Sequence, residues 1–254
     1  MKNCVRLIGN VVLIMALAFT FMACPDPDPN PNPDPDLLIG EVSQPPTDPA
    51  LAGEFGVYTS GTNLVIKSGT QVYVPNTGAA AYASPYSSGS TWTFNFGIYG
   101  SGGLGVIGTA SLPTNGILDT ITIIAPPNAF LESVSSHFDS LLPLPAGSIK
   151  EGASTLIGTL RMRDSSYMAI DIFSSNAFFQ SNNWFSGECY MYFYSKGNVT
   201  VQLPMTEIEE NYYCEIDVQL KEGWNCVAVS DSEDTITLVS KNPPANARWI
   251  YCRL

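Results

Sequence analysis

The sequence predicts an all-β fold, an antiparallel β-sandwich, and three observations lead to this prediction. After residue 50, apolar and polar residues alternate with a period of two along most of the chain, which is typical of strands with one buried face. Gly, Pro and Asn clusters separate the alternating runs, as turns do. Only 13% of residues are charged, while Gly, Ser, Thr and Tyr are frequent, a balance typical of exported β-rich domains.

The chain divides into three predicted parts. We expect a signal peptide over residues 1–23, a disordered Pro/Asp-rich linker over residues 24–49, and a β-rich ectodomain over residues 50–254. The ectodomain is long enough for one large sandwich or for two packed lobes, in which case the lobe boundary falls at residues 126–148.

The first part has the features of an export signal. Lys2 and Arg6 precede an apolar run over residues 11–22, which ends at Ala23-Cys24. This run is shorter than the ~20 residues that a membrane-spanning helix needs. We therefore predict that the segment is cleaved during export.

The cleavage region is similar to a known motif. Phe21-Met22-Ala23-Cys24 resembles the lipobox of bacterial lipoproteins, in which a small residue precedes a cysteine that is lipidated and becomes the new N-terminus. Phe21 departs from the pattern, because the family usually has Leu or another aliphatic residue there. The resemblance implies lipidation of Cys24, with ordinary cleavage or an uncleaved anchor as alternatives. Several acyl chains, at about 0.8 kcal/mol per buried methylene, would hold the chain stably on a membrane.

The linker alternates Pro with Asp or Asn over residues 25–36. Proline fixes φ and keeps the preceding residue out of the helical region, so the segment is expected to be extended. At ~3.1 Å per residue it would reach about 37 Å as a spacer.

Charge excludes two classes of partner. The formal net charge is −12, and removal of residues 1–23 with Lys2 and Arg6 leaves 9 basic and 23 acidic residues, a net charge of −14. Nucleic acid and anionic membrane surfaces bind through clustered Lys and Arg, so neither is an expected partner. We expect no cofactor and no metal site.

Strands of the ectodomain follow from the alternation. The clearest is residues 91–98, where Trp92, Phe94, Phe96 and Ile98 share one face. The other predicted strands are 64–67, 71–74, 104–110, 117–124, 155–162, 167–173, 188–194, 199–203, 212–220, 225–230, 235–239 and 248–252. Residues 195–198 and 221–224 are expected to be hairpin turns because of their glycines.

One segment has helical periodicity instead. Phe130, Val134, Phe138 and Leu141 recur at helical spacing, and Asn128 can cap the helix. The pattern predicts one short helix over residues 128–141, at the possible lobe boundary.

Four cysteines of the ectodomain lie in its last third, namely Cys189, Cys214, Cys226 and Cys252. An even number in an exported chain indicates two disulfides. A hairpin at residues 221–224 would hold Cys214 and Cys226 too far apart to bond, which disfavours the pairing of Cys189 with Cys252. Of the two remaining connectivities we favour Cys189–Cys214 with Cys226–Cys252. Free buried thiols and a metal site are the alternatives.

The C-terminal region has a second resemblance. Leu220-Lys221-Glu222-Gly223-Trp224-Asn225 resembles a turn with a leucine, a basic residue and Gly-Trp-Asn in the tails of uncharacterised bacterial lipoproteins. The resemblance covers about 100 residues and implies no activity.

Catalytic patterns in the sequence are weak. Residues 100–105 match a dinucleotide-binding glycine pattern, but strand rather than helix follows, so a hairpin connection is expected. His137 is the sole histidine, and its neighbours Ser136 and Asp139 do not face it on a helix, so we expect it to face solvent. No catalytic residue is predicted.

Acidic residues leave two alternatives open. Glu188, Glu215 and Asp217 could supply paired carboxylates for glycoside hydrolysis, although solvated strand faces explain them more simply. Residues 231–234 form an acidic turn that could hold calcium but lack fixed ligand spacing.

Tyrosines form a row on one strand. Tyr190, Tyr192 and Tyr194 share a face, and such a row either packs in a sandwich core or forms an exposed strip that binds glycans. The sequence as a whole predicts a non-catalytic lipoprotein of the cell envelope, attached to a membrane by lipid on Cys24 and either periplasmic or surface-exposed. A glycan-binding or adhesive module is the alternative, a glycoside hydrolase is less expected, and the protein or glycan partner is undefined.

Overall fold

The structure is a computed structural model, and it describes residues 56–75, 83–100, 103–141, 144–164, 168–173, 178–180, 184–232, 234–244 and 246–253. The predicted signal peptide, the linker and Cys24 lie outside these residues.

The described part is all-β, as the alternation predicts. Most predicted strands are present and differ from the prediction by a few residues at their ends. The strands are β1 Val57–Ser60, β2 Asn63–Ile66, β3 Thr70–Pro75, β4 Ala83–Pro85, β5 Trp92–Gly100, β6 Gly103–Leu112, β7 Ile117–Leu118, β8 Ile121–Ile123, β9 Glu132–Ser133, β10 Ile149–Glu151, β11 Leu156–Asp164, β12 Met168–Phe173, β13 Phe178–Gln180, β14 Trp184–Ser195, β15 Val199–Glu209, β16 Tyr212–Leu220, β17 Gly223–Asp231, β18 Thr235–Ser240 and β19 Arg248–Arg253. The predicted strand 117–124, however, is two short strands, β7 and β8, which pair with β3 and β2 respectively. The prediction missed β1, β4, β9, β10 and β13.

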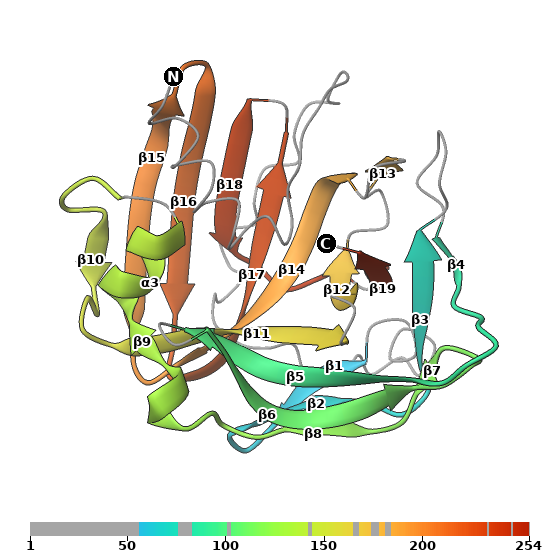
Figure 1. The fold of residues 1–254 in the computed structure, drawn as a ribbon. Helices are drawn as coiled ribbons and strands as arrows, with labels where there is room; N and C mark the ends of the chain where they lie inside the picture. The colour runs from blue at the N-terminus through green and yellow to red at the C-terminus, as the bar shows by residue number, and fades with distance from the viewer. Residues whose placement is uncertain are drawn as a thin grey trace.

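The strands form one large sheet and one small sheet. The small sheet has the order β1-β2-β8, and the main path of the large sheet is β10-β15-β16-β18-β17-β14-β11-β12-β19-β3-β4. Pairing is antiparallel except between β16 and β18 and between β19 and β3. Figure 1 shows β15, β16, β18, β17 and β14 side by side in orange and red, with β1, β2 and β8 below, next to the β5–β6 hairpin.

Apolar side chains gather on both faces of the large sheet. The first core lies between the two sheets and contains Leu64 and Ile123 of the small sheet together with Phe94, Tyr192 and Trp249 of the large one. The second core lies on the opposite face. Its buried side chains come mainly from β14 to β18 and from the helix, with Ile157 of β11 and Ile250 of β19, and they include Phe138, Cys189, Phe193, Cys214 and Val227. Burial of apolar area on both faces is the main stabilising contribution to a sandwich.

The predicted helix over residues 128–141 is shorter than expected. A 3-10 turn, Asn128–Phe130, comes first, the strand β9 follows, and the helix α3 spans Val134–Leu141. β9 interrupts the helix because its two residues pair with Ile157 and Leu156 of β11. Ser133 rather than Asn128 caps α3, since its Oγ accepts a hydrogen bond of 3.2 Å from the Ser136 N–H.

The expected lobe boundary at residues 126–148 does not interrupt the large sheet. Strand β5, before this segment, pairs with β11, after it, over six residues. The last strand, β19, lies between β12 and β3, so the two ends of the described chain also meet in this sheet.

The two predicted hairpin turns connect strands that are not paired with each other. β18 lies between β16 and β17, parallel to β16 and antiparallel to β17. Residues 195–198 join β14 to β15, which β17, β18 and β16 separate in the sheet order. Near the link from β16 to β17, the Ser240 hydroxyl at the end of β18 accepts from the Gln219 N–H and donates to the Gln219 carbonyl, so the ends of β18 and β16 are tied together.

Candidate functional site

The most chemically organised cluster lies where α3 meets the large sheet. His137 of α3 is only 1% exposed, and its Nδ1 atom lies 2.7 Å from Oε1 of Glu132 on β9. Its Nε2 atom lies 3.0 Å from Oγ1 of Thr159 on β11. The Ser136 hydroxyl donates to the other carboxylate oxygen, Oε2, at 3.3 Å. The cluster therefore ties three elements together through one imidazole.

An ionised carboxylate only accepts hydrogen bonds, so the Nδ1–H of His137 donates to Glu132. In the neutral ring Nε2 is then an acceptor, which the Thr159 hydroxyl satisfies. The order hydroxyl, imidazole, carboxylate is that of hydrolytic triads. Thr159 is buried, however, so a substrate has no access to its hydroxyl in this conformation. These hydrogen bonds hold α3 against β9 and β11.

The prediction that His137 faces solvent is wrong. Its ring packs edge-on against Phe193, with a centroid separation of 5.8 Å, as well as against Phe138. The prediction failed because it considered only Ser136 and Asp139 as partners. Glu132 is on β9, which precedes the helix in the chain, and Thr159 is on β11, which follows it.

A second polar cluster lies within β14, around Glu188. Lys241 Nζ is 2.8 Å and 3.0 Å from the two carboxylate oxygens of Glu188, and the Tyr190 hydroxyl donates to Oε2 of the same carboxylate. Burial, followed by the hydrogen bond to Glu188, raises the pKa of Tyr190 well above its ordinary value. Lys241 and Glu188 are partly exposed, so their pair is expected to contribute little stability.

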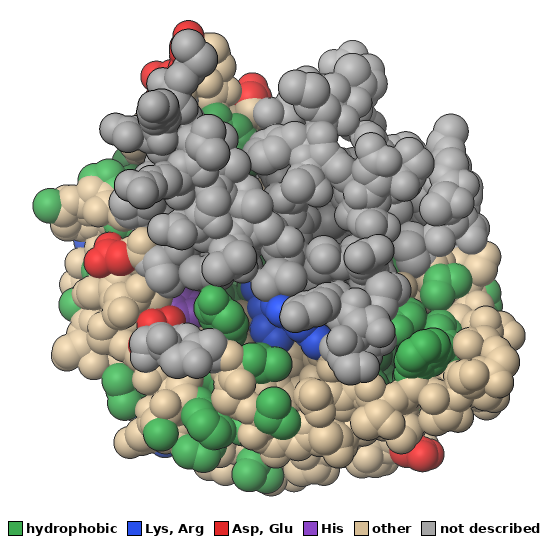
Figure 2. Space-filling view, viewed as in Figure 1, with side chains coloured by type: hydrophobic (Ala, Val, Ile, Leu, Met, Phe, Trp, Pro, Cys, Tyr) green, Lys and Arg blue, Asp and Glu red, His purple; other side chains and the backbone are tan. Residues whose placement is uncertain are grey.

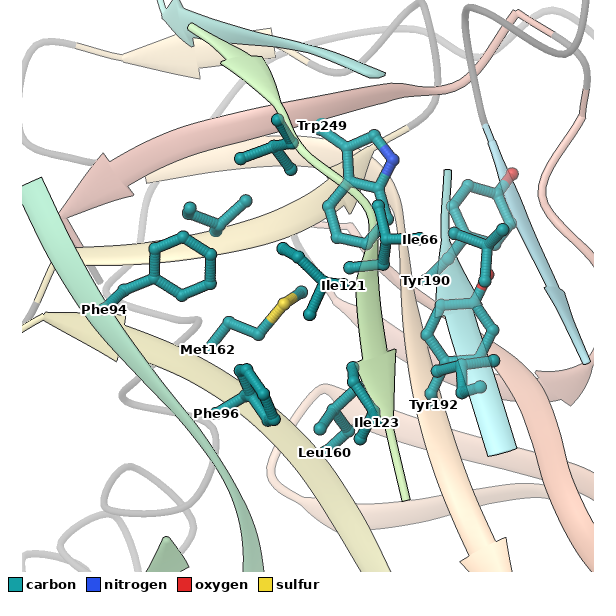
Figure 3. Close-up of a cluster of buried hydrophobic side chains, with 14 of the residues drawn as sticks. Ile66, Phe94, Phe96, Ile121, Ile123, Leu160, Met162, Tyr190, Tyr192 and Trp249 are labelled. Atoms are coloured by element: carbon teal, nitrogen blue, oxygen red, sulfur yellow. The ribbon is translucent and has the colours of Figure 1, made fainter. Parts of the chain in front are cut away.

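The tyrosine row is in the core and does not form an exposed strip. Tyr190, Tyr192 and Tyr194 are all buried in the first core. In Figure 3, Tyr190 and Tyr192 lie beside Ile66 and Ile123 of the small sheet. Tyr194 contacts Trp224 edge-on at 5.2 Å between ring centroids. Of the two alternatives for this row, core packing is confirmed.

The candidate acidic residues do not converge. Glu188 is on β14 and Glu215 and Asp217 are on β16, so two strands and roughly 14 Å separate them at ~4.8 Å per strand. Glu215 is exposed, and Asp217 accepts a hydrogen bond of 3.2 Å from Gln202. In the turn at residues 231–234, the Ser232 and Thr235 hydroxyls bond Asp234.

The predicted disulfides Cys189–Cys214 and Cys226–Cys252 are not formed, since Cys189, Cys214 and Cys226 are buried and none of the three is in a disulfide bond. Cys189 and Cys214 lie on β14 and β16, with two strands and roughly 14 Å between them, whereas a disulfide needs Cα atoms within about 7 Å. Cys226 is on β17 and faces the first core, whereas Cys189 and Cys214 face the second. Of Cys252, the structure describes only the backbone in β19.

Burial also keeps the thiols of Cys214 and Cys226 protonated. Loss of solvation, together with the nearby Glu215 carboxylate, raises the pKa of Cys214 to about 12. Burial and then the neighbouring Cys189 raise the pKa of Cys226 well above its ordinary value. Since the thiolate is the reactive form, both residues behave as apolar core side chains.

The Gly-Trp-Asn turn has a structural explanation. Asn225 is buried, its Oδ1 accepts from the Lys221 N–H at 2.9 Å, and its Nδ2 donates to the carbonyls of Lys221 at 2.8 Å and Gly223 at 3.0 Å. Gly223 has φ of 103°, which favours glycine. Asn225 thus holds the link from β16 to β17, and Trp224 anchors it on Tyr194.

The glycine pattern at residues 100–105 is part of a hairpin, as expected. Gly100 pairs with Gly103, so β5 turns directly into β6. Gly105 lies under the ring of Phe130, and a Cβ at this position would be 2.4 Å from that ring. Close packing of side chain on backbone accounts for this glycine.

The described residues contain neither a metal-binding group nor a membrane-spanning helix. No group of three or more His, Cys, Asp or Glu side chains in the ranges given above is arranged to hold a metal ion. Neither of the helical segments there is long and apolar enough to span a membrane.

Comparisons with protein-family models, with curated proteins and with solved structures gave no match to this chain.

Proposed function

We propose that this chain is a lipid-anchored, non-catalytic lipoprotein of the cell envelope, which carries its β-rich ectodomain on an extended linker. The observation that carries this proposal is the N-terminal sequence, in which an apolar run ends at Ala23-Cys24 and the Pro/Asp-rich linker follows. The described body begins at residue 56, after both segments.

The described body agrees with a non-catalytic role. Its only histidine bonds a buried hydroxyl and a buried carboxylate, so no substrate reaches the imidazole in this conformation. The tyrosines that would have formed a glycan-binding strip are in the core, which removes the sequence argument for such a strip. An anchored body that presents its surface to other envelope components is the simplest function for these features.

The anchor is tested by the substitution Cys24→Ser in the full chain. Acyl chains on the Cys24 sulfur would hold the protein in the membrane fraction, and their loss should release it or leave an uncleaved precursor. Cys4→Ser is the matched control, because Cys4 belongs to the segment that is removed. The measurements are membrane fractionation, incorporation of labelled fatty acid and the mass of the N-terminal peptide. A native N-terminal peptide without acyl groups would contradict the proposal.

A further inference from the structure

Among the described strands, β6 forms an edge of the large sheet. Within the described part of the chain it pairs with β5 alone, and the backbone groups of its other edge bond no described residue. Gly103–Leu112 contains no charged residue and no proline. The side chain of Val106 is 48% exposed, and Thr109 and Ser111 are also exposed. An unpaired strand of this kind offers a row of donors and acceptors to another strand.

The other long edge strand shows what a protected edge looks like. β15 pairs with β16 along its length, while β10 covers only its beginning. The uncovered part carries Pro204, Glu207 and Glu209, and two register shifts interrupt its pairing. Proline, charge and bulges are the usual means by which proteins block edge pairing. β6 has one bulge, at Ile107, and neither of the other two protections.

Charge distribution indicates what would pair with β6. The chain has a net charge of −12, yet no Asp, Glu, Lys, Arg or His occurs between Lys67 and Asp119. This charge-free segment, residues 68–118, includes β3 to β7. Over the area where Figure 1 places β6, Figure 2 shows mainly apolar and uncharged side chains. Two copies of an acidic chain repel each other least where they meet through such a surface.

We propose that β6 pairs with β6 of a second copy of this chain, antiparallel and across a two-fold axis. An antiparallel edge is complementary to itself, because the same row of N–H and C=O groups supplies both sides of the ladder. A strand from a different protein would need complementary charges to be selected by β6, and β6 carries no charged residue. The pairing joins the large sheets of two copies into one continuous sheet.

The test uses the full chain, expressed with two different epitope tags in the same cells and extracted in mild detergent. Copies with the two tags should co-purify. The double variant Val106→Lys with Thr109→Lys places two positive charges on each edge, and in the dimer they would face the same charges of the other copy. It should reduce co-purification at least tenfold. Met205→Lys is the matched control, because Met205 is 53% exposed on the protected edge β15, and it should leave co-purification unchanged.

Two readouts make the outcome decisive. Circular dichroism and thermal melting show whether the double variant keeps the wild-type fold. If it does not, the single variant Thr109→Lys replaces it in the co-purification experiment. Single cysteines at Val106, Thr109 and Ser111 should give disulfide-linked dimers on oxidation, with the highest yield nearest the two-fold axis, whereas Thr122→Cys on β8 should not. Wild-type chains that fail to co-purify would overturn the proposal, whether or not a foreign strand or a glycan binds β6. Co-purification that survives both lysines would also overturn it.

Discussion

The imidazole of His137 and the carboxylate of Glu132 lie 2.7 Å apart, buried where α3, β9 and β11 meet. They are five positions apart in the chain, and the change from strand to helix between them brings them together. The Thr159 hydroxyl bonds the other side of the imidazole, so removal of the ring would take a hydrogen bond from Thr159 and would leave the Glu132 carboxylate with the Ser136 hydroxyl as its remaining hydrogen-bond donor in this cluster.

We predict that His137→Ala lowers the free energy of unfolding by about 3 kcal/mol, because it removes the closest partner of a buried carboxylate, which then keeps only the longer hydrogen bond from Ser136. Thr159→Val, which removes one hydroxyl and keeps the side-chain shape, should cost about 1 kcal/mol. Urea unfolding followed by tryptophan fluorescence measures both. Equal effects of the two substitutions would show that the carboxylate does not depend on His137.

Asn225 provides a second test. Asn225→Ala removes three hydrogen bonds to the backbone of the link from β16 to β17, and we expect a loss of about 2–3 kcal/mol in the free energy of unfolding. Asn198→Ala, an exposed change in the link from β14 to β15, should stay within about 0.5 kcal/mol of wild type. Thermal and urea unfolding of the two variants provide the comparison, and similar losses would contradict a specific role for Asn225.

The buried thiols should not react in the folded chain. Iodoacetamide at pH 8 is expected to leave Cys189, Cys214 and Cys226 unmodified in the native protein and to modify all three in denaturant, because burial excludes the reagent and keeps the thiols protonated. Peptide mass spectrometry reads out each site. A disulfide-linked peptide that contains any of these cysteines would contradict the absence of disulfide bonds at these positions.

Alkaline pH should destabilise the fold through Cys214. In the unfolded chain this thiol ionises near pH 9, whereas its pKa in the folded chain is about 12. Its contribution to stability is therefore complete below pH 9 and is lost as the pH rises from 9 toward 12, by about 1.4 kcal/mol per pH unit. Cys214→Ala should make the decline in urea-unfolding free energy between pH 9 and 10.5 less steep. If the unfolding free energy of Cys214→Ala fell as steeply with pH as that of wild type, the raised pKa of Cys214 would be contradicted.

Gly158 tests the packing of β11. A Cβ at Gly158 would lie 2.3 Å from Cγ2 of Ile98 and 2.9 Å from Cδ2 of Leu131, so we expect Gly158→Ala to cost about 1–3 kcal/mol. Gly89→Ala is the control, because nothing lies within 4 Å of its added methyl group. Differential scanning calorimetry distinguishes them, and a Gly158→Ala melting temperature equal to that of wild type would show that the strands move apart easily.

Strand positions could be predicted from the sequence because alternation is a local property. The run from Trp92 to Ile98 indicated one buried face, and Phe94, Phe96 and Ile98 are indeed buried, whereas Trp92 at the strand end is exposed. Pairing could not be predicted in the same way. The Gly223 turn suggested that β16 and β17 are neighbours, but β18 pairs with both of them and lies between them.

The same limit applies to the candidate site. Alternation correctly placed Tyr190, Tyr192 and Tyr194 on one face, but whether another layer covers that face depends on strands more than 60 residues away in the chain, such as β2 and β8. The partners of His137 were missed because Thr159 comes from β11. The even number of cysteines suggested disulfides, and only the strand order showed that Cys189 and Cys214 are too far apart.

The place of β19 has a consequence for how the molecule forms. Its six residues are the last that the structure describes, and they join β12 to β3. The connection between β12 and β3 in the large sheet therefore cannot form until β19 is in place, although β3 lies more than 170 residues earlier in the chain. Such long-range pairing slows folding. Deletion of β19 would leave β3 and β12 each with one unpaired edge.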